Sequence, residues 1–206
     1  MTITRQEQAA GTRLRILDAA VEVLVDVGYA GASTLQIQQR AGLSRGGLLH
    51  QFGSRDELLV AAVDHLTTMH VAALTMPRVW PAEPGERIDA AVDAMWEQYR
   101  QPFFWASLEL WFASRHNPEV ARGLGPHERR LNGLVKRSVE AFFGPELASH
   151  VAFSDAVHLL LSSMRGVGVS YALQPSRDPG RDPHVRIWKD LARRLLLEGV
   201  EQPPKV

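Results

Sequence analysis

The chain has 206 residues, of which 45% are hydrophobic and 22% charged, and its formal net charge at pH 7 is zero. These values are ordinary for a globular protein, and they leave room for a small domain of about 50 residues beside a larger one of about 150. The sequence contains no cysteine, which excludes a disulfide scaffold, a thiolate metal site and a thiol nucleophile.

The first predicted helix covers residues 13–27 and ends at Gly28. Its apolar residues recur every three or four positions, which is the spacing of one helical face. They are Leu14, Leu17, Val21, Leu24 and Val25. The polar residues 1–12 that precede this helix are expected to form a flexible arm.

Two short helices joined by a tight turn are predicted for residues 33–52. Ser33 is a good N-cap for the first helix, and Ile37 supplies an apolar position on it. Gly42 follows and can adopt the positive φ of a tight turn. Leu43 can then fill the angle between the two helices.

Ser44 is the N-cap of the second helix, which carries Leu48 and Phe52 four residues apart on one face. The opposite face is small, basic and able to form hydrogen bonds, and it consists of Arg45, Gly46, Gly47, His50 and Gln51. A helix with an apolar inner face and such an outer face is what the major groove of DNA admits. Residues 33–52 therefore predict a helix-turn-helix that binds DNA.

Charge is distributed unevenly around this motif, although the whole chain is neutral. Between Ser33 and Arg55 the sequence has three arginines, Arg40, Arg45 and Arg55, and no acid. The nearest acids before the motif belong to the preceding helix. A locally basic surface on a neutral protein still neutralises phosphates, so this distribution is compatible with salt-dependent DNA binding.

A long helix is predicted from its N-cap Ser54 to Met76, where Pro77 stops it. Proline and glycine boundaries separate five further predicted helices, at residues 85–100, 102–115, 118–143, 152–173 and 183–198. No run with useful β alternation is present. The predicted fold class is all-α with about nine helices, in an N-terminal helix-turn-helix domain at residues 1–53 and a C-terminal bundle at residues 54–206.

Roughly the first 60 residues resemble the DNA-binding domain of the tetracycline-repressor-like (TetR/AcrR) family of transcriptional regulators. The matching residues, in order and at matching spacing, are Gly28-Tyr29, Ser33, Ile37, Ala41-Gly42-Leu43-Ser44, Arg45-Gly46, Phe52 and Ser54-Arg55-Asp56-Glu57-Leu58. The resemblance implies a ligand-responsive repressor. Such a protein binds a palindromic DNA operator as a homodimer and is released by a small, mainly apolar or aromatic effector.

DNA contacts are expected from the N-termini of the two short helices, from the second of them, and from Arg55 as a phosphate contact. The full set is Ser33, Thr34, Ser44, Arg45, Gly46, Gly47, Leu49, His50, Gln51 and Arg55. Arg5 and Arg13 could also reach the DNA backbone or minor groove, although a disordered tail is the expected fate of Arg5.

Three residues depart from the family pattern: Gln38, Gly47 and Leu49 stand where Ala, Thr and Tyr are usual. The alternative function is therefore a helical ligand-binding protein whose operator recognition is weakened. The affinity for an operator and its sequence cannot be transferred from the family, because two of these changes remove expected DNA contacts.

The helix predicted at residues 152–173 is apolar nearly all round, so one of its faces should pack on its own domain and the other on a second partner. Small residues on it permit close helix approach, and the last helix adds an apolar stripe. The homodimer interface is expected at Ser163, Gly166, Gly168, Trp188, Leu191 and Leu195. The alternative is a larger monomeric core that uses the same stripe.

Aromatic residues are concentrated between Trp96 and Phe112, where the family has its effector pocket. The expected ligand-binding residues are Trp96, Tyr99, Phe103, Glu109, Phe112, His158, Met164 and Arg165. The alternative is that the aromatic residues form plain core. Glu109 and Arg165 interrupt apolar stretches, and we expect them to pair as a structural bridge, the alternative being a contact with a ligand of opposite charge.

Enzyme and metal motifs are missing from the sequence: it has no nucleophile elbow and no Walker A loop. His65 and His70 are five residues apart, which does not place two metal ligands on one helical face. We therefore expect no catalytic activity, cofactor or metal. No stretch of about 18 uncharged apolar residues occurs, and the first residues lack the core of a signal peptide, so a cytoplasmic protein without a membrane partner is expected.

Overall fold

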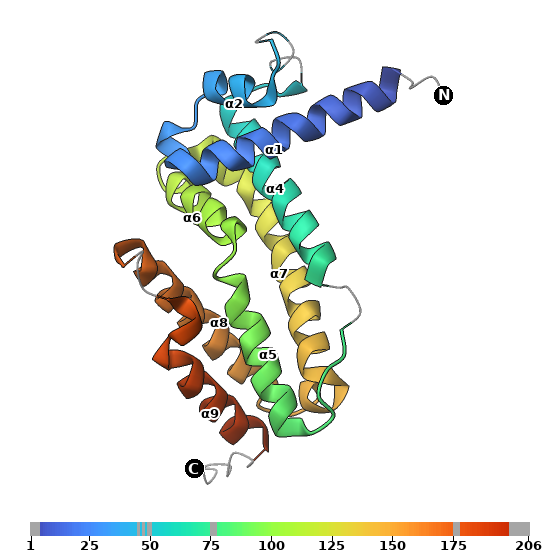
Figure 1. Ribbon diagram of the computed structural model, residues 1–206, viewed down its shortest axis with the longest axis vertical. Coiled ribbons are helices and arrows are strands. Elements are labelled where there is room, and N and C mark those ends of the chain that lie inside the picture. Colours follow the sequence, from blue (N-terminus) through green and yellow to red (C-terminus); the bar gives the residue numbers. More distant parts are fainter. Residues whose placement is uncertain are drawn as a thin grey trace. The chain divides into compact units, whose positions relative to one another are not determined.

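The computed structural model describes residues 5–44, 46, 48, 51–74, 78–174 and 178–197. All regular secondary structure within these residues is helical (Figure 1). The all-α fold class predicted from the sequence is therefore confirmed. No helix of the described segments combines the length and the hydrophobicity that a membrane crossing requires.

The α-helices in chain order are α1 (Arg5–Gly31), α2 (Thr34–Ala41), α4 (Arg55–Leu74), α5 (Pro84–Gln98), α6 (Pro102–Ser114), α7 (Pro118–Ala148), α8 (Phe153–Ser170) and α9 (Pro183–Leu197). Two short 3-10 helices, η1 (Tyr171–Leu173) and η2 (Pro179–Arg181), lie between α8 and α9. Gly46, Leu48 and Gln51 are also helical, at the position predicted for the second helix of the helix-turn-helix.

The start of α1 corrects the expectation of a flexible arm, because residues 5–12 are helical. Arg, Gln, Glu and Ala dominate this segment, and all four have high helix propensity. At the other end, Gly28 has the non-helical angles φ 69° and ψ 176°, so the regular helix is interrupted there as predicted, and a further short helical stretch reaches Gly31.

A second glycine kink lies in α7, where the sequence predicted an end at residue 143. Gly144 has φ 83°, and helical structure continues beyond it to Ala148. The carbonyl groups just before the kink lose their helical partners there. Arg87 of α5 supplies donors to two of them, those of Phe142 and, at 2.8 Å, Ala141.

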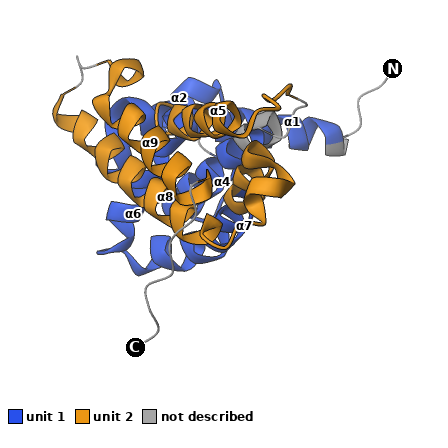
Figure 2. Ribbon diagram, turned by 90° about the horizontal axis from the view of Figure 1, so that it is seen from below, with its two compact units in different colours: residues 1–74, 102–134 blue, residues 75–101, 135–206 orange. Residues whose placement is uncertain are grey.

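The chain forms two compact units, which Figure 2 shows in different colours. Unit 1 consists of residues 1–74 and 102–134, and unit 2 consists of residues 75–101 and 135–206. Unit 1 therefore joins α6 and the first part of α7 to the N-terminal helices. A division into domains at residue 53 stays a prediction.

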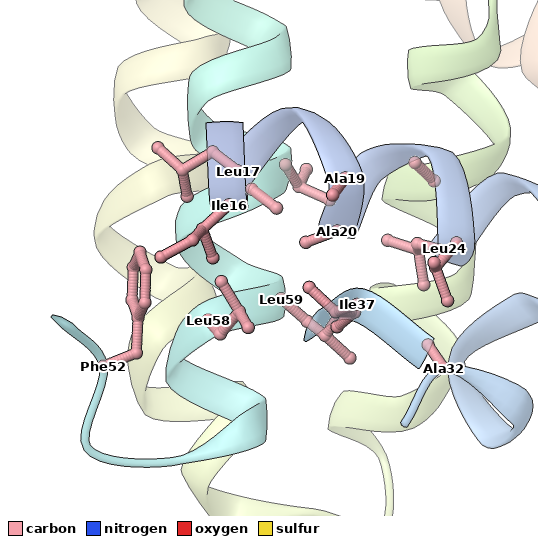
Figure 3. Packing of buried hydrophobic residues seen from close by; sticks show 14 of the residues in the cluster. Ile16, Leu17, Ala19, Ala20, Leu24, Ala32, Ile37, Phe52, Leu58 and Leu59 are labelled. Carbon is pink, nitrogen blue, oxygen red and sulfur yellow. The ribbon is translucent and has the colours of Figure 1, made fainter. Parts of the chain in front are cut away.

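The core of unit 1 is built around α1, which packs against α2, α4 and α6. Its fully buried side chains come from these helices and from the segment before α4, and include Ile16, Leu24, Ile37, Phe52, Leu58 and Leu59 (Figure 3). Burying one side chain of this size contributes about 1.5–3 kcal/mol relative to leaving it exposed. The short helix α2 thus depends on this packing for its position.

Unit 2 contains α5, α8, α9 and the last part of α7, and α9 packs against both α5 and α8. The inner face of α8 is buried and carries Phe153, Ala156, Leu160, Met164 and Gly168. Its other face is exposed, so the nearly continuous apolar sequence of this helix is buried on one side within the chain.

Candidate nucleic-acid interface

The first helix of the motif, α2, begins with a capping box. The Ser33 hydroxyl accepts a hydrogen bond from the backbone N–H of Gln36 at 3.2 Å, and the Gln36 side chain accepts one from the N–H of Ser33 at 3.0 Å. Two N–H groups that the helix leaves unpaired are satisfied in this way. The prediction that Ser33 caps this helix is confirmed.

The turn after α2 has the geometry that its glycine predicts. Gly42 has φ 65° and ψ 39°, a left-handed conformation that costs glycine little. Its N–H donates to the carbonyl of Gln39 at 3.2 Å, and the N–H of Leu43 donates to that of Gln38 at 3.1 Å. These bonds close the C-terminus of α2 and direct the chain towards the next helix.

The second helix of the motif turns its apolar side inward as predicted. Leu48 and Phe52 are each 2% exposed and belong to the core of unit 1. Gly46 and Ser44 are exposed, and Gln51 is half-buried. Four of the predicted DNA contacts, Arg45, Gly47, Leu49 and His50, lie outside the described residues.

Arg13 of α1 holds the end of this helix. Its guanidinium donates to the backbone carbonyl of Gln51 at 3.2 Å and lies 4.3 Å from the centre of the Phe52 ring. A cation at the C-terminus of a helix also complements the helix dipole. Arg13, which was expected to be able to reach the DNA backbone or minor groove, is in this structure a positioning residue for the motif.

Arg55, which stays a predicted phosphate contact, has several partners inside unit 1. Its guanidinium donates to the backbone carbonyls of Tyr29 and Ala32, pairs with Asp56 at 3.0 Å and lies 4.4 Å from the centre of the Tyr29 ring. The side chain is 28% exposed. A guanidinium with this many partners inside the unit links the end of α1 to the start of α4, and it has few donors left for DNA.

Arg40, the third arginine of the motif, pairs with two acids of α1. Its guanidinium lies 2.9 Å from Glu22 and 3.0 Å from Asp26. Both pairs are exposed, so each contributes little to stability. They nevertheless reduce the local positive charge that the sequence suggested, because the acids of the preceding helix lie beside this arginine.

Tyr29 is the centre of a polar junction that the sequence did not predict. Its hydroxyl donates to Asp56 at 2.7 Å and accepts from the side-chain N–H of Asn117 at 3.0 Å. Burial, together with the hydrogen bond to Asp56, raises the pKa of Tyr29. Asn117 in turn accepts from the N–H of Glu119 at 2.9 Å at the start of α7. The junction therefore connects α1, α4 and α7.

Glu109 of α6 belongs to the same region. Its carboxylate accepts a hydrogen bond from the N–H of Tyr29 at 2.7 Å, directly after the kink at Gly28. This partner explains the acid in the apolar stretch of α6, so no bridge to Arg165 is needed to account for it. The only sequence signals for this junction were the isolated acid and the Gly28-Tyr29 pair.

The expected ligand-binding residues are distributed over both units, and their grouping into one pocket stays a prediction. Trp96, Tyr99 and Met164 lie in unit 2, whereas Phe103, Glu109 and Phe112 lie in unit 1. Phe112 is 58% exposed, and its role in a pocket stays a prediction. His158 and Arg165 are exposed on the outer face of α8, and Phe103 is half-buried.

The buried aromatic residues of unit 2 form a core whose polar atoms are satisfied. Trp96 lies 4.9 Å from Trp188 between ring centres and donates to the carbonyl of Pro179 at 2.8 Å. Tyr99 donates to the carbonyl of Leu161 at 3.0 Å, and burial raises its pKa to about 12. These contacts account for the polar atoms of Trp96 and Tyr99 within unit 2, and their role in a pocket stays a prediction.

Some residues expected at the dimer interface are buried inside the chain, and others are exposed. Trp188 and Gly168 are buried within unit 2, and Trp188 donates to the hydroxyl of Ser163 at 2.9 Å. These residues hold α8 and α9 together inside one chain. Gly166 is exposed, and a side chain added there would meet nothing within 4 Å.

Comparison with known proteins supplies a family. Residues 16–62 match the model described as bacterial regulatory proteins, tetR family. The HTH-type transcriptional regulator BetI of Paraburkholderia phytofirmans is 33% identical over 123 residues, which cover 58% of this chain and 63% of that protein. BetI of Burkholderia cenocepacia is 31% identical over 123 residues with the same coverage. The chain thus matches less than two thirds of the length of these curated relatives.

Solved structures resemble the chain over nearly its whole length. A transcriptional regulator from a Rhodococcus species has a TM-score of 0.69 at 20% identity and covers 93% of this chain and 99% of its own. The multidrug binding protein EbrR, in complex with ethidium, has a TM-score of 0.58 at 19% identity, with coverages of 87% and 97%. At these identities the likeness shows the fold alone.

Proposed function

We propose that the chain is a tetR-family regulator, a homodimeric repressor released from a palindromic operator by a small effector. We assign it no catalytic role and place it in the cytoplasm, where its DNA would lie. The proposed domains are a DNA-binding domain at residues 1–53 and an effector-binding and dimerisation domain at residues 54–206.

The observation that supports DNA binding is that the helix after Gly42 has one buried apolar side and one exposed side. Leu48 and Phe52 anchor its inner side in the core, while Gly46 on the other side is exposed. A helix held from behind by packing and at its C-terminal end by Arg13 is suited to enter a major groove. Arg45 and His50 are the proposed base contacts, and Ser33, Thr34 and Ser44 the proposed backbone contacts.

Dimerisation is proposed through the outer faces of α8 and α9. Large apolar side chains are exposed there: Leu159 is 50% exposed, Ile187 51% and Leu197 46%. The exposed Gly166 would let a second helix approach closely. A palindromic operator has two half-sites, so a two-fold dimer is the assembly that would match it.

Release by an effector is proposed through unit 1. Glu109 of α6 contacts the backbone of Tyr29, whose side chain contacts Asp56 of α4. A ligand that shifts α6 or α7 would therefore act on the helices that hold the motif. EbrR was crystallised with ethidium and with proflavin, which supports an apolar or aromatic effector class.

The experiment that tests this function uses the purified full chain and fragmented DNA from the source genome. Bound fragments are selected, the protected sequence is mapped, and its affinity is measured at several salt concentrations. We expect a palindromic site whose affinity falls steeply with salt. If no fragment is selected above random DNA, the alternative of a ligand-binding protein with weakened operator recognition replaces this proposal.

Variants of the recognition helix sharpen the same test. Arg45→Ala and His50→Ala should each weaken operator binding by about 1–3 kcal/mol, the usual effect of losing a base contact. Arg137→Ala, an exposed arginine of α7, is the matched control and should bind as the wild type. Unchanged affinity in both recognition-helix variants would remove this helix from its proposed role.

A further inference from the structure

Three buried polar atoms find no hydrogen-bond partner among the described residues: Oγ1 of Thr67, Oγ of Ser107 and Nε2 of His127. The residues are 1%, 6% and 4% exposed, respectively. All three belong to unit 1, on α4, α6 and α7. Leaving a buried polar group unpaired is costly, so each of these atoms is expected to have a partner that is not part of the chain.

The contacts between α4 and α7 indicate that Thr67 and His127 lie on facing sides of these two helices. A side chain at Gly123 would lie 3.2 Å from Val60, and four residues further along both helices His127 contacts Asp64 at 2.7 Å. The two helices therefore run side by side in the same direction. Thr67 lies three residues after Asp64, which places it on the same side of α4, one turn further along.

The contacts of α6 indicate which side of that helix carries Ser107. Trp111 donates from its indole N–H to Glu128 at 2.6 Å, and Glu128 directly follows His127. Ser107 lies four residues before Trp111 and so faces the same side of α6. Each of the three polar residues also lies three or four residues from a core residue of unit 1 on its own helix, namely Val63, Leu110 or Leu124.

The hydrogen bond made by Nδ1 of His127 determines whether the other ring nitrogen, Nε2, donates or accepts a hydrogen bond. Nδ1 lies 2.7 Å from a carboxylate oxygen of Asp64, and a carboxylate only accepts, so Nδ1 carries the hydrogen. Nε2 of the neutral ring is then a bare acceptor. Arg130 pairs with the same carboxylate on the exposed side, so the charge of Asp64 is balanced without the buried ring.

We propose that Thr67, Ser107 and His127 form a hydrogen-bonding subsite that binds a hydroxyl group on an otherwise apolar or aromatic ligand. The ligand hydroxyl donates to Nε2 of His127 and accepts from the hydroxyl of Thr67 or Ser107. A charged group is disfavoured, because the subsite offers it no buried counter-charge. The inference rests on the proposed function, for which it names the chemical class of the effector.

The test compares phenol with benzene, which has the same ring but lacks the hydroxyl. Full-length protein is labelled with ¹⁵N-histidine, and the His127 signals are assigned with the His127→Gln variant. Phenol should shift the Nε2 resonance of His127 in a saturable way, whereas benzene should leave it unchanged. If both probes shift it equally, or neither shifts it, the subsite holds only water or packing and the proposal is overturned.

Two nearly isosteric variants separate ligand binding from a structural role. Thr67→Val and Ser107→Ala should weaken phenol binding about three- to tenfold, the usual effect of losing one neutral hydrogen bond. Neither should lower the melting temperature, because each removes a buried polar atom that the folded chain leaves unpaired. Thr68→Val is the matched control: its hydroxyl donates to the carbonyl of Asp64 at 2.8 Å, and phenol binding should not change.

The opposite pattern would overturn the inference. Lower melting temperatures with unchanged phenol affinity would identify Thr67 and Ser107 as structural. The DNA selection experiment tests the proposed function independently of the phenol experiment. If the chain selects an operator but fails the phenol test, only the proposed subsite is overturned. If it binds phenol but selects no DNA, only the proposed repressor function is overturned.

Discussion

Arg13 and Gln51 are 38 residues apart in sequence, yet the Arg13 guanidinium donates to the Gln51 carbonyl at 3.2 Å. The same guanidinium lies over the ring of Phe52, the residue that anchors this helix in the core. The long helix α1 therefore helps to hold the end of the second helix of the motif. If that helix binds DNA as proposed, α1 positions it without touching a base.

The first prediction concerns Arg13 as a positioning residue. Arg13→Gln should weaken binding to the mapped operator about three- to tenfold, because one exposed hydrogen bond and one ring contact are lost. Arg13→Lys keeps the charge but not the planar group, so it should retain affinity for random DNA while losing affinity for the operator. Equal losses on operator and random DNA in the Lys variant would contradict a positioning role.

The second prediction concerns the cap of α2. Ser33→Ala should lower the free energy of unfolding by about 1 kcal/mol, because the N–H of Gln36 loses its acceptor. Ser33→Asp keeps an acceptor at the cap and should be nearly as stable as the wild type. The added negative charge should nevertheless weaken DNA binding if this cap lies near phosphate. Urea unfolding and operator binding, measured on both variants, check the two effects separately.

The third prediction concerns the kink at Gly28, whose φ of 69° and ψ of 176° are reserved almost entirely for glycine. A Cβ added there would also lie 3.0 Å from a carboxylate oxygen of Glu109. Gly28→Ala should therefore destabilise the protein by about 1–3 kcal/mol. In a double-mutant cycle with Glu109→Ala, part of that loss should be recovered, because the close contact disappears while the backbone strain remains. Strict additivity would argue against the contact.

The fourth prediction concerns pH and His127. Burial lowers the pKa of His127 from its ordinary value of 6.5, although the Glu128 charge opposes this. Below pH 6.5 the unfolded chain binds the proton more readily than the folded chain, so the free energy of unfolding should fall as the pH decreases towards the lowered pKa. His127→Gln should lose this part of the pH dependence in urea unfolding between about pH 5 and 8. A wild type that becomes more stable than the variant on acidification would show that the pairing with Asp64 outweighs burial.

The fifth prediction concerns the outer face of α8. Gly166→Leu should reduce the dimer fraction in sedimentation without unfolding the chain, because nothing in the chain lies within 4 Å of the added side chain. Gly11→Leu, at an equally open helical glycine of α1, is the matched control and should leave the dimer intact. Both changes also raise helix propensity, so a lost dimer cannot be attributed to a weaker helix. An intact dimer in the Gly166 variant would place the interface elsewhere.

The sequence by itself determined the helix-turn-helix, because the signals involved are local. A cap such as Ser33 bonds to a residue three positions away, a left-handed turn needs only Gly42, and the four-residue spacing of Leu48 and Phe52 fixes which side faces inward. Each of these interactions is complete within a few residues, so it can be predicted without knowing the rest of the fold.

The tertiary structure alone decided which partners the charged and aromatic side chains have. Arg13, Arg55 and Glu109 all bond to backbone groups 23 to 80 residues away, which no spacing rule predicts. Apolar density between residues 96 and 112 indicated burial but could not distinguish a satisfied core from a cavity. That distinction depends on which polar atoms remain unpaired after the helices pack, and in the described residues these are on Thr67, Ser107 and His127.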